Sequence, residues 1–279
     1  MKKTLCYTVI GLALAGCGSD DPHPGVMPGF PPSGNLPSDP SQGQGDTDNQ
    51  PPTDSVTPPD GPNSSFKLIS GIYKGRSDLY LNVEGLIDDN KNLWFIYSDS
   101  ENNIEGFVAS NDKITGNSGK FTVSGKDFSE VTEDITITGN YQEGNKIFGA
   151  MARQSSNQIS YSVTYDKVQS EVKQSLQNLS GRSFFGESYM TADDRLRDTL
   201  VRFDAGGNFT GSSAGCNFTG NMRLSESKIY FISSLTFNGI ACDANGQTFP
   251  GVALLNEDND LIFLGKKSST ALYFYGSSR

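Results

Sequence analysis

The chain has 279 residues, a formal net charge of −10 and a single histidine. This acidity, without any basic stripe that carries interleaved aromatic residues, argues against nucleic acid as a partner. The histidine, His23, lies in a proline-rich segment, so Ser-His-Asp and Cys-His catalytic arrangements are excluded from the folded part.

Residues 1–16 have the pattern of a secretory signal peptide. Met1-Lys2-Lys3 is a short positive start, and Leu5 to Ala15 is an apolar run too short to span a membrane. The run ends in Leu14-Ala15-Gly16-Cys17, which resembles the lipobox of bacterial lipoproteins. That resemblance implies that Cys17 receives a diacylglyceryl group and becomes the acylated N-terminus after cleavage.

The lipid defines one expected partner, the membrane. Each buried methylene contributes about 0.8 kcal/mol, and two or more acyl chains hold a protein stably. In lipoproteins an Asp directly after the cysteine tends to retain the protein at the inner membrane, whereas this chain has Gly18 there. The resemblance therefore implies the outer membrane. Both its periplasmic face and its exterior face stay as alternatives.

Residues 17–65 form the predicted lipidated cysteine and its tether. Residues 18–65 hold 12 of the 13 prolines, seven Asp and no Lys or Arg. Such a segment cannot bury enough apolar surface to offset its ordering entropy, so we predict disorder. Its extended reach is on the order of 100 Å. We favour a passive spacer over a specific proline-rich ligand motif.

Residues 66–165 read as an N-terminal β domain, because short alternating segments are separated by Asp-, Asn- and Gly-rich turns. Asp134-Ile135-Thr136-Ile137-Thr138 shows the period of two most plainly. The pattern indicates an antiparallel barrel or sandwich. The expected strands are Leu79–Ile87, Leu93–Tyr97, Ile104–Ala109, Lys120–Ser124, Asp134–Tyr141, Lys146–Arg153 and Gln158–Tyr165.

Residues 166–179 read as a linking helix. Val168, Val172, Leu176 and Leu179 fall at helical spacing, and Asp166 stands where an N-cap belongs. We expect this stripe to pack between the two domains rather than to bind a partner.

Residues 180–279 repeat the β pattern as a C-terminal domain. Both halves open alike, with Ser70-Gly71-Ile72-Tyr73-Lys74-Gly75 and Ser180-Gly181-Arg182-Ser183-Phe184-Phe185-Gly186, which suggests an old duplication. The expected strands are Thr199–Asp204, Asn208–Ser212, Asn217–Leu224, Lys228–Phe237, Gly251–Asn256, Leu261–Gly265 and Ala271–Tyr275.

Cys216 and Cys242 are the thiols left after processing. In an exported protein such a pair indicates a disulfide, and closing its 26-residue separation would stabilise the fold by about 3 kcal/mol. A metal or redox role is disfavoured, because there is no CxxC motif and no second cluster of ligands.

Two resemblances follow from these motifs. Gly207–Gly211, Gly215–Gly220, Cys242 and Pro250–Ala253, together with Gly85–Asp89, Leu93–Tyr97 and Gly106–Val108, are similar to a group of uncharacterised proteobacterial two-domain lipoproteins. Phe203–Gly220 also resembles the META/HslJ-like domain, in which a helix usually precedes the last strands, and here Ala244–Phe249 is the segment available for it. Neither resemblance carries a catalytic residue.

The remaining acidic motifs are typical of turns and loops rather than of catalytic or calcium sites. The carboxylate pairs Asp193-Asp194 and Glu257-Asp258 are adjacent, but neighbours on a strand face opposite sides and both pairs read as solvated loops. Asp88, Asn90 and Asn92 alternate like the start of a calcium loop, but its later glycine and glutamate are missing, so a turn is favoured. We expect no catalytic residue, metal or cofactor.

Trp94, Phe95 and Tyr97 are candidate ligand-facing aromatics, although aromatics on a strand more often fill a core. The sequence favours a non-enzymatic outer-membrane lipoprotein that acts as an interaction module for an unknown envelope or extracellular protein. Two alternatives stay open. One is binding of a small apolar or carbohydrate ligand, and the other is a carboxylate-dependent hydrolase.

Overall fold

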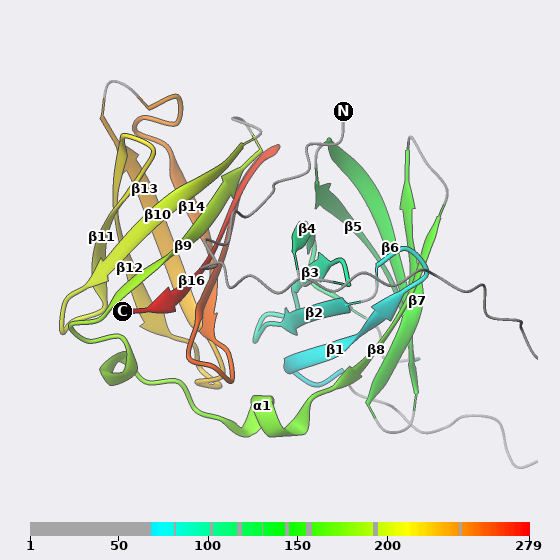
Figure 1. The fold of residues 1–279 in the computed structure, drawn as a ribbon. Helices are drawn as coiled ribbons and strands as arrows, with labels where there is room; N and C mark the ends of the chain where they lie inside the picture. The colour runs from blue at the N-terminus through cyan, green and yellow to red at the C-terminus, as the bar shows by residue number, and fades with distance from the viewer. Residues whose placement is uncertain are drawn as a thin grey trace, which may run out of the picture. The chain divides into compact units, whose positions relative to one another are not determined.

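The structure is a computed structural model that describes residues 68–279 except 81, 101–102, 116–118, 130, 143–144, 155–157, 192–194 and 240–241. Cys17, His23, the predicted signal peptide and the tether lie outside the described residues. The described part is almost all antiparallel strand, in two closed barrels of eight strands each (Figure 1). The all-β prediction is confirmed, and both domains are barrels rather than sandwiches. No helix among the described residues is long and apolar enough to cross a membrane.

The N-terminal barrel runs up and down, with each strand paired antiparallel to the next. β1 and β8 also pair, Tyr73 lying opposite Tyr165, so the sheet closes and has no free edge. Its strands are β1 (Gly71–Ser77), β2 (Asn82–Ile87), β3 (Leu93–Ser98), β4 (Ile104–Ser110), β5 (Lys120–Phe128), β6 (Thr132–Gln142), β7 (Lys146–Arg153) and β8 (Ile159–Tyr165).

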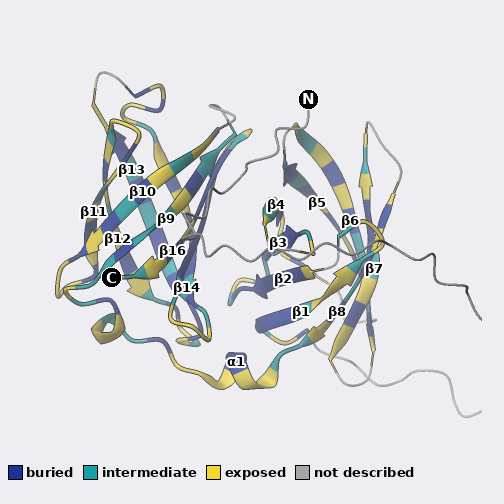
Figure 2. Cartoon of the chain, viewed as in Figure 1, coloured by how far each residue is buried: buried dark blue, intermediate teal, exposed yellow. Residues whose placement is uncertain are grey.

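The interior of this barrel is filled by every second side chain of its strands. In β5, Phe121 and Val123 are buried while Thr122 and Ser124 are exposed, and Figure 2 shows the same banding along several strands. Eight strands enclose a space that side chains can just fill. Buried aromatic and branched side chains from all eight strands form one continuous cluster there.

Alternation does not predict two of the strands, β1 and β9 (Ser183–Met190). In β1 the neighbours Ile72 and Tyr73 are both buried, because Tyr73 belongs to the barrel interior and Ile72 to a cluster on the outer face. A strand buried on both faces loses its period of two. Both strands begin at the two similar sequence openings, so these openings mark the start of each barrel.

The linker holds two short turns instead of one helix over residues 166–179. Asp166 caps α1 (Lys167–Glu171), as predicted, by accepting a hydrogen bond from the Gln169 backbone N–H at 3.0 Å. Val168 and Val172 are 75% and 54% exposed, so the packed stripe is wrong in its first half. The helix stops because the Gln174 N–H bonds Lys228 O at 2.8 Å, across to the second barrel.

The C-terminal barrel repeats the up-and-down order, and β9 pairs with both β10 and β16 to close it. Its remaining strands are β10 (Arg195–Phe203), β11 (Asn208–Ser213), β12 (Cys216–Leu224), β13 (Phe231–Asn238), β14 (Thr248–Leu255), β15 (Leu261–Lys267) and β16 (Thr270–Ser278). The segment where a META/HslJ-like helix would stand forms turns and then enters β14.

Phenylalanines fill this second interior. Consecutive ring pairs, with centroids 5.3–6.4 Å apart, run through Phe184, Phe203, Phe209, Phe218, Phe237 and Phe249. At the linker end Leu179 is fully buried and Leu176, in the 3-10 turn Leu176–Asn178, packs on the same cluster. Gly207 has φ +84°, and a Cβ there would lie 2.8 Å from Leu176 Cδ2. The linker therefore plugs one end of the barrel.

Outward-facing side chains of both barrels join in one further buried cluster. It contains Trp94, Phe107 and Phe128 from the first barrel and Tyr230 and Tyr273 from the second. The Asp89 N–H donates to Tyr230 Oη at 3.1 Å, and Lys266 Nζ donates to Ser110 O at 2.5 Å. Strand faces, and not the predicted helix stripe, make most of this contact.

Candidate functional site

The three predicted ligand-facing aromatics of β3 do not share a cavity. Phe95 and Tyr97 point into the first barrel, where they are 2% and 1% exposed and packed in its core. Trp94 points the opposite way, into the cluster shared with the second barrel, and its Nε1 donates to Asp88 Oδ2 at 3.3 Å. The structure places all three in packed surroundings.

A buried ion pair lies at the end of the first barrel that is far from the linker. Arg153 pairs with Asp127, which is only 2% exposed, and Tyr97 Oη donates to Asp127 Oδ1 at 2.5 Å. The ring of Tyr80 stacks on Tyr97 with centroids 4.2 Å apart. Burial raises the pKa of Asp127, while the Tyr97 hydrogen bond and the Arg153 charge counteract that rise. This group closes the barrel end rather than opening a site.

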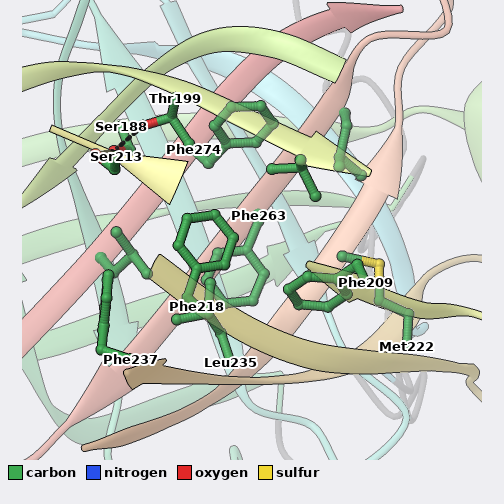
Figure 3. A pocket seen from close by; sticks show the side chains of 13 residues that line it. Ser188, Thr199, Phe209, Ser213, Phe218, Met222, Leu235, Phe237, Phe263 and Phe274 are labelled. Atoms are coloured by element: carbon green, nitrogen blue, oxygen red, sulfur yellow. Dashed lines mark hydrogen bonds between the residues drawn. The ribbon is translucent and has the colours of Figure 1, made fainter. Parts of the chain in front are cut away.

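The second barrel contains an internal gap, shown in Figure 3. Its walls are phenylalanine rings and aliphatic side chains, with three hydroxyl groups, those of Ser188, Thr199 and Ser213, gathered at one side. The gap leaves about 20 Å³ for the centre of a water-sized sphere. That is room for about one water, so the interior is filled.

The three hydroxyl groups form a hydrogen-bonded chain. Thr199 Oγ1 lies 3.1 Å from Arg197 O, to which it can donate, and 2.6 Å from Ser188 Oγ, which in turn lies 3.1 Å from Ser213 Oγ. In each hydroxyl pair either oxygen can be the donor, and a hydroxyl oxygen has two lone pairs, so Ser213 Oγ can accept a further hydrogen bond.

A second, wider cavity begins beside Ser188 and Ser213, at the barrel end opposite the linker plug. The centre of a water molecule can occupy about 80 Å³ of this cavity. Its lining includes the charged side chains of Arg197 and the exposed Asp243 and the apolar side chains of Phe237 and Leu272. We call this space the mouth cavity, and sequence reasoning did not find it.

The disulfide Cys216–Cys242 lies at the mouth cavity, with the two Cα atoms 5.1 Å apart. Cys216 follows the hairpin of Ala214 and Gly215, both with positive φ as a type I′ turn requires. Cys242 is buried in the connection between β13 and β14. The disulfide therefore ties two loops of the cavity rim together.

The carboxylates weighed for catalysis or calcium have ordinary roles where they are described. Asp193-Asp194 lies outside the described residues. Asp88 Oδ1 accepts from the Asn92 N–H and Oδ2 from Asn92 Nδ2, both at 2.8 Å, which is the turn geometry favoured by the sequence. Within the described residues no three His, Cys, Asp or Glu side chains are placed to hold a metal ion.

Glu257 belongs to a charged cluster beside the linker. Lys74 Nζ lies 2.8 Å from Glu257 Oε1, 3.3 Å from Asp166 Oδ2 and 3.8 Å from Glu84 Oε1, and Gln169 Nε2 donates to Glu257 Oε1 at 2.7 Å. Glu84 Oε1 is buried and accepts no hydrogen bond from any described residue. Burial raises the pKa of Glu84, and the Lys74 charge offsets this only in part.

This raised pKa predicts a pH-dependent effect of Glu84→Gln. The folded chain holds the Glu84 proton more tightly than the unfolded chain, so the wild type gains stability as pH falls through the folded pKa. The variant lacks this gain. We expect it to be more stable at pH 7, by no more than about 1 kcal/mol, with the difference closing towards pH 4. Urea unfolding across this range measures it.

The exposed carboxylate of Glu105, in the same barrel, provides the matched control. Glu105→Gln removes a carboxylate at this exposed position and is measured over the same pH range. A Glu84→Gln variant that is less stable than the wild type at pH 7 would show that the Lys74 ion pair outweighs burial.

Comparison with known proteins adds little to this geometry. No family profile and no curated protein matches the chain. A solved structure, a "putative outer membrane protein" from Bacteroides fragilis, aligns over 75% of this chain and 97% of its own at 15% identity, with a TM-score of 0.26. A likeness at that score carries no argument about fold or function.

Proposed function

We propose that the chain is a lipid-anchored outer-membrane protein whose two barrels form a protein-interaction module without catalytic activity. One observation supports an interaction module. Both interiors are filled, by the aromatic and aliphatic cluster of the first barrel and by the phenylalanines of the second. Recognition then falls to the surfaces and loops. The anchor itself rests on the sequence around Cys17.

Closure of the barrels narrows the mode of recognition. A partner that adds a strand needs an unpaired sheet edge, and both barrels pair their first and last strands. The partner must therefore be bound by side chains and loop backbones. The shared cluster and the linker contacts connect the barrels, which offers a surface built from both.

Crosslinking in intact cells tests this function. The full chain carries a C-terminal affinity tag, and captured proteins are identified by mass spectrometry. The matched control places residues 1–65 in front of an unrelated soluble domain. We expect one defined envelope protein to be enriched at least tenfold with the full chain and not with the control. Equal capture by both would assign the interaction to the lipid or tether.

The anchor has a separate test. Cys17→Ala removes the sulfur that would carry the lipid, so this variant should take up no labelled palmitate and should leave the membrane fraction. The wild type should take up labelled palmitate and should stay in the membrane fraction. Palmitate incorporation that persists in the variant would place the lipid elsewhere.

The barrel interiors give little support to the two alternatives, ligand binding and hydrolysis. The gap in the second barrel holds about one water, so neither a lipid nor a sugar fits within it. For the hydrolase, Glu257 is engaged by Lys74 and Gln169 and lies in an exposed loop. Within the described residues, space for a ligand is found at the mouth cavity.

A further inference from the structure

The mouth cavity has the size of a single small ligand. Its 80 Å³ for water-sized centres corresponds to about six water molecules. The exposed Asp243 stands on its rim, so the space reaches solvent, while Ser188 and Ser213 form its buried floor. A molecule entering there would be partly enclosed and would stop above the filled interior.

The floor of the cavity presents hydroxyl groups to a ligand. Ser213, Ser188 and Thr199 are linked by hydrogen bonds, and Ser213 stands at the end of this chain. Ser213 is buried, and its Oγ has a lone pair left to accept a hydrogen bond. A ligand O–H or N–H that donates to this oxygen adds a hydrogen bond.

The walls of the cavity combine polar and apolar groups. Among the described residues, Arg197 and Asp243 line it with charged side chains, and Phe237 and Leu272 line it with apolar ones. A molecule that has both hydroxyl groups and C–H groups matches this lining.

We propose that the mouth cavity binds a polyhydroxylated molecule of monosaccharide size, with one ligand hydroxyl donating to Ser213 Oγ. Asp243 accepts from a second hydroxyl at the rim, and the C–H face of the ligand lies on Phe237 and Leu272. The same chemistry belongs to a free sugar and to the terminal unit of a glycan. The inference is independent of the protein-interaction function.

Direct binding measurements test it on the mature full chain in detergent. Saturation-transfer NMR is recorded with glucose, galactose, mannose, N-acetylglucosamine and glycerol, and immobilised glycans with these sugars at their ends form the second arm. We expect saturable binding of at least one sugar. Glycan binding with sugar competition would identify a terminal unit, and binding in solution alone would identify a free sugar.

Matched variants on one strand locate the site. Ser213→Ala removes the floor acceptor and is expected to weaken binding about tenfold, the effect of one hydrogen bond. Ser212→Ala alters the adjacent, exposed position of β11 and should leave binding unchanged. Asp243→Ala, at an exposed position where folding is safe, should also weaken binding.

Two results would overturn the proposal. One is the absence of saturable binding in both arms with the disulfide intact. The other is sugar binding that Ser213→Ala and Asp243→Ala leave at the wild-type level, because the sugar would then sit elsewhere. Neither result bears on the capture of an envelope protein.

Discussion

Asp127→Ala is expected to lower the free energy of unfolding by about 3–5 kcal/mol, the usual cost of removing one partner from a buried ion pair. The variant leaves Arg153 and the Tyr97 hydroxyl without the carboxylate to which both bind. Urea unfolding followed by fluorescence measures the loss, because the single tryptophan, Trp94, belongs to this barrel.

Asp134 supplies the matched control for this prediction. It pairs with Lys126 at 2.5 Å in the same barrel, but its side chain is 63% exposed. Asp134→Ala should therefore cost less than about 1 kcal/mol. A double replacement, Asp127→Leu with Arg153→Met, should recover much of the loss, since it leaves no buried charge unpaired. Equal effects of the two Ala variants would contradict the structural role of Asp127.

Loss of the Cys216–Cys242 disulfide is expected to cost about 3 kcal/mol, because the unfolded chain is freed from a 26-residue loop constraint. The double variant Cys216→Ala with Cys242→Ala should unfold at lower urea concentration. Circular dichroism is the suitable probe, since the second barrel contains no tryptophan.

Reduction of the wild type provides the control. With dithiothreitol the wild type should unfold at nearly the same urea concentration as the double variant, and the variant itself should not respond to the reductant. If oxidised and reduced wild type unfold together, the disulfide contributes nothing and serves only to hold the cavity rim.

Most strands follow from the sequence because one face of each is wet. The repeated Ile-Thr pattern of β6 and the turn chemistry around Asp88 give both period and boundary. Alternation does not predict β1, because Ile72 and Tyr73 are buried on opposite faces. That information is tertiary, since it depends on which outer faces meet the other barrel.

Closure is also beyond the reach of local pattern. Nothing in β1 or β8 alone says that Tyr73 pairs with Tyr165, because the contact depends on the tilt and number of the strands between them. Likewise the helical spacing of Val168 and Val172 is real, but hydrogen bonding of Gln174 to the second barrel ends the helix before the spacing can be used.

The mouth cavity left one signal in the sequence. In β11 the buried Phe209 and the buried Ser213 lie on one face, so the inward face turns from aromatic to polar at the strand end. In β10 Thr199 likewise follows the same inward face as Val201 and Phe203. Polar residues at inward-facing positions near a strand end therefore indicate the cavity, whereas the aromatic residues of β3 indicate only a filled core.

The pairing of the first and last strands has a mechanical consequence. In the second barrel the Arg279 N–H bonds Ser183 O at 2.9 Å, so the chain enters and leaves at the same end. Tension between the linker and the C-terminus would load the hydrogen bonds of the β9–β16 ladder one after another. Tension applied at the far mouth would instead strain many rungs together. The direction of a pull, more than its size, would then decide whether the barrel stays shut.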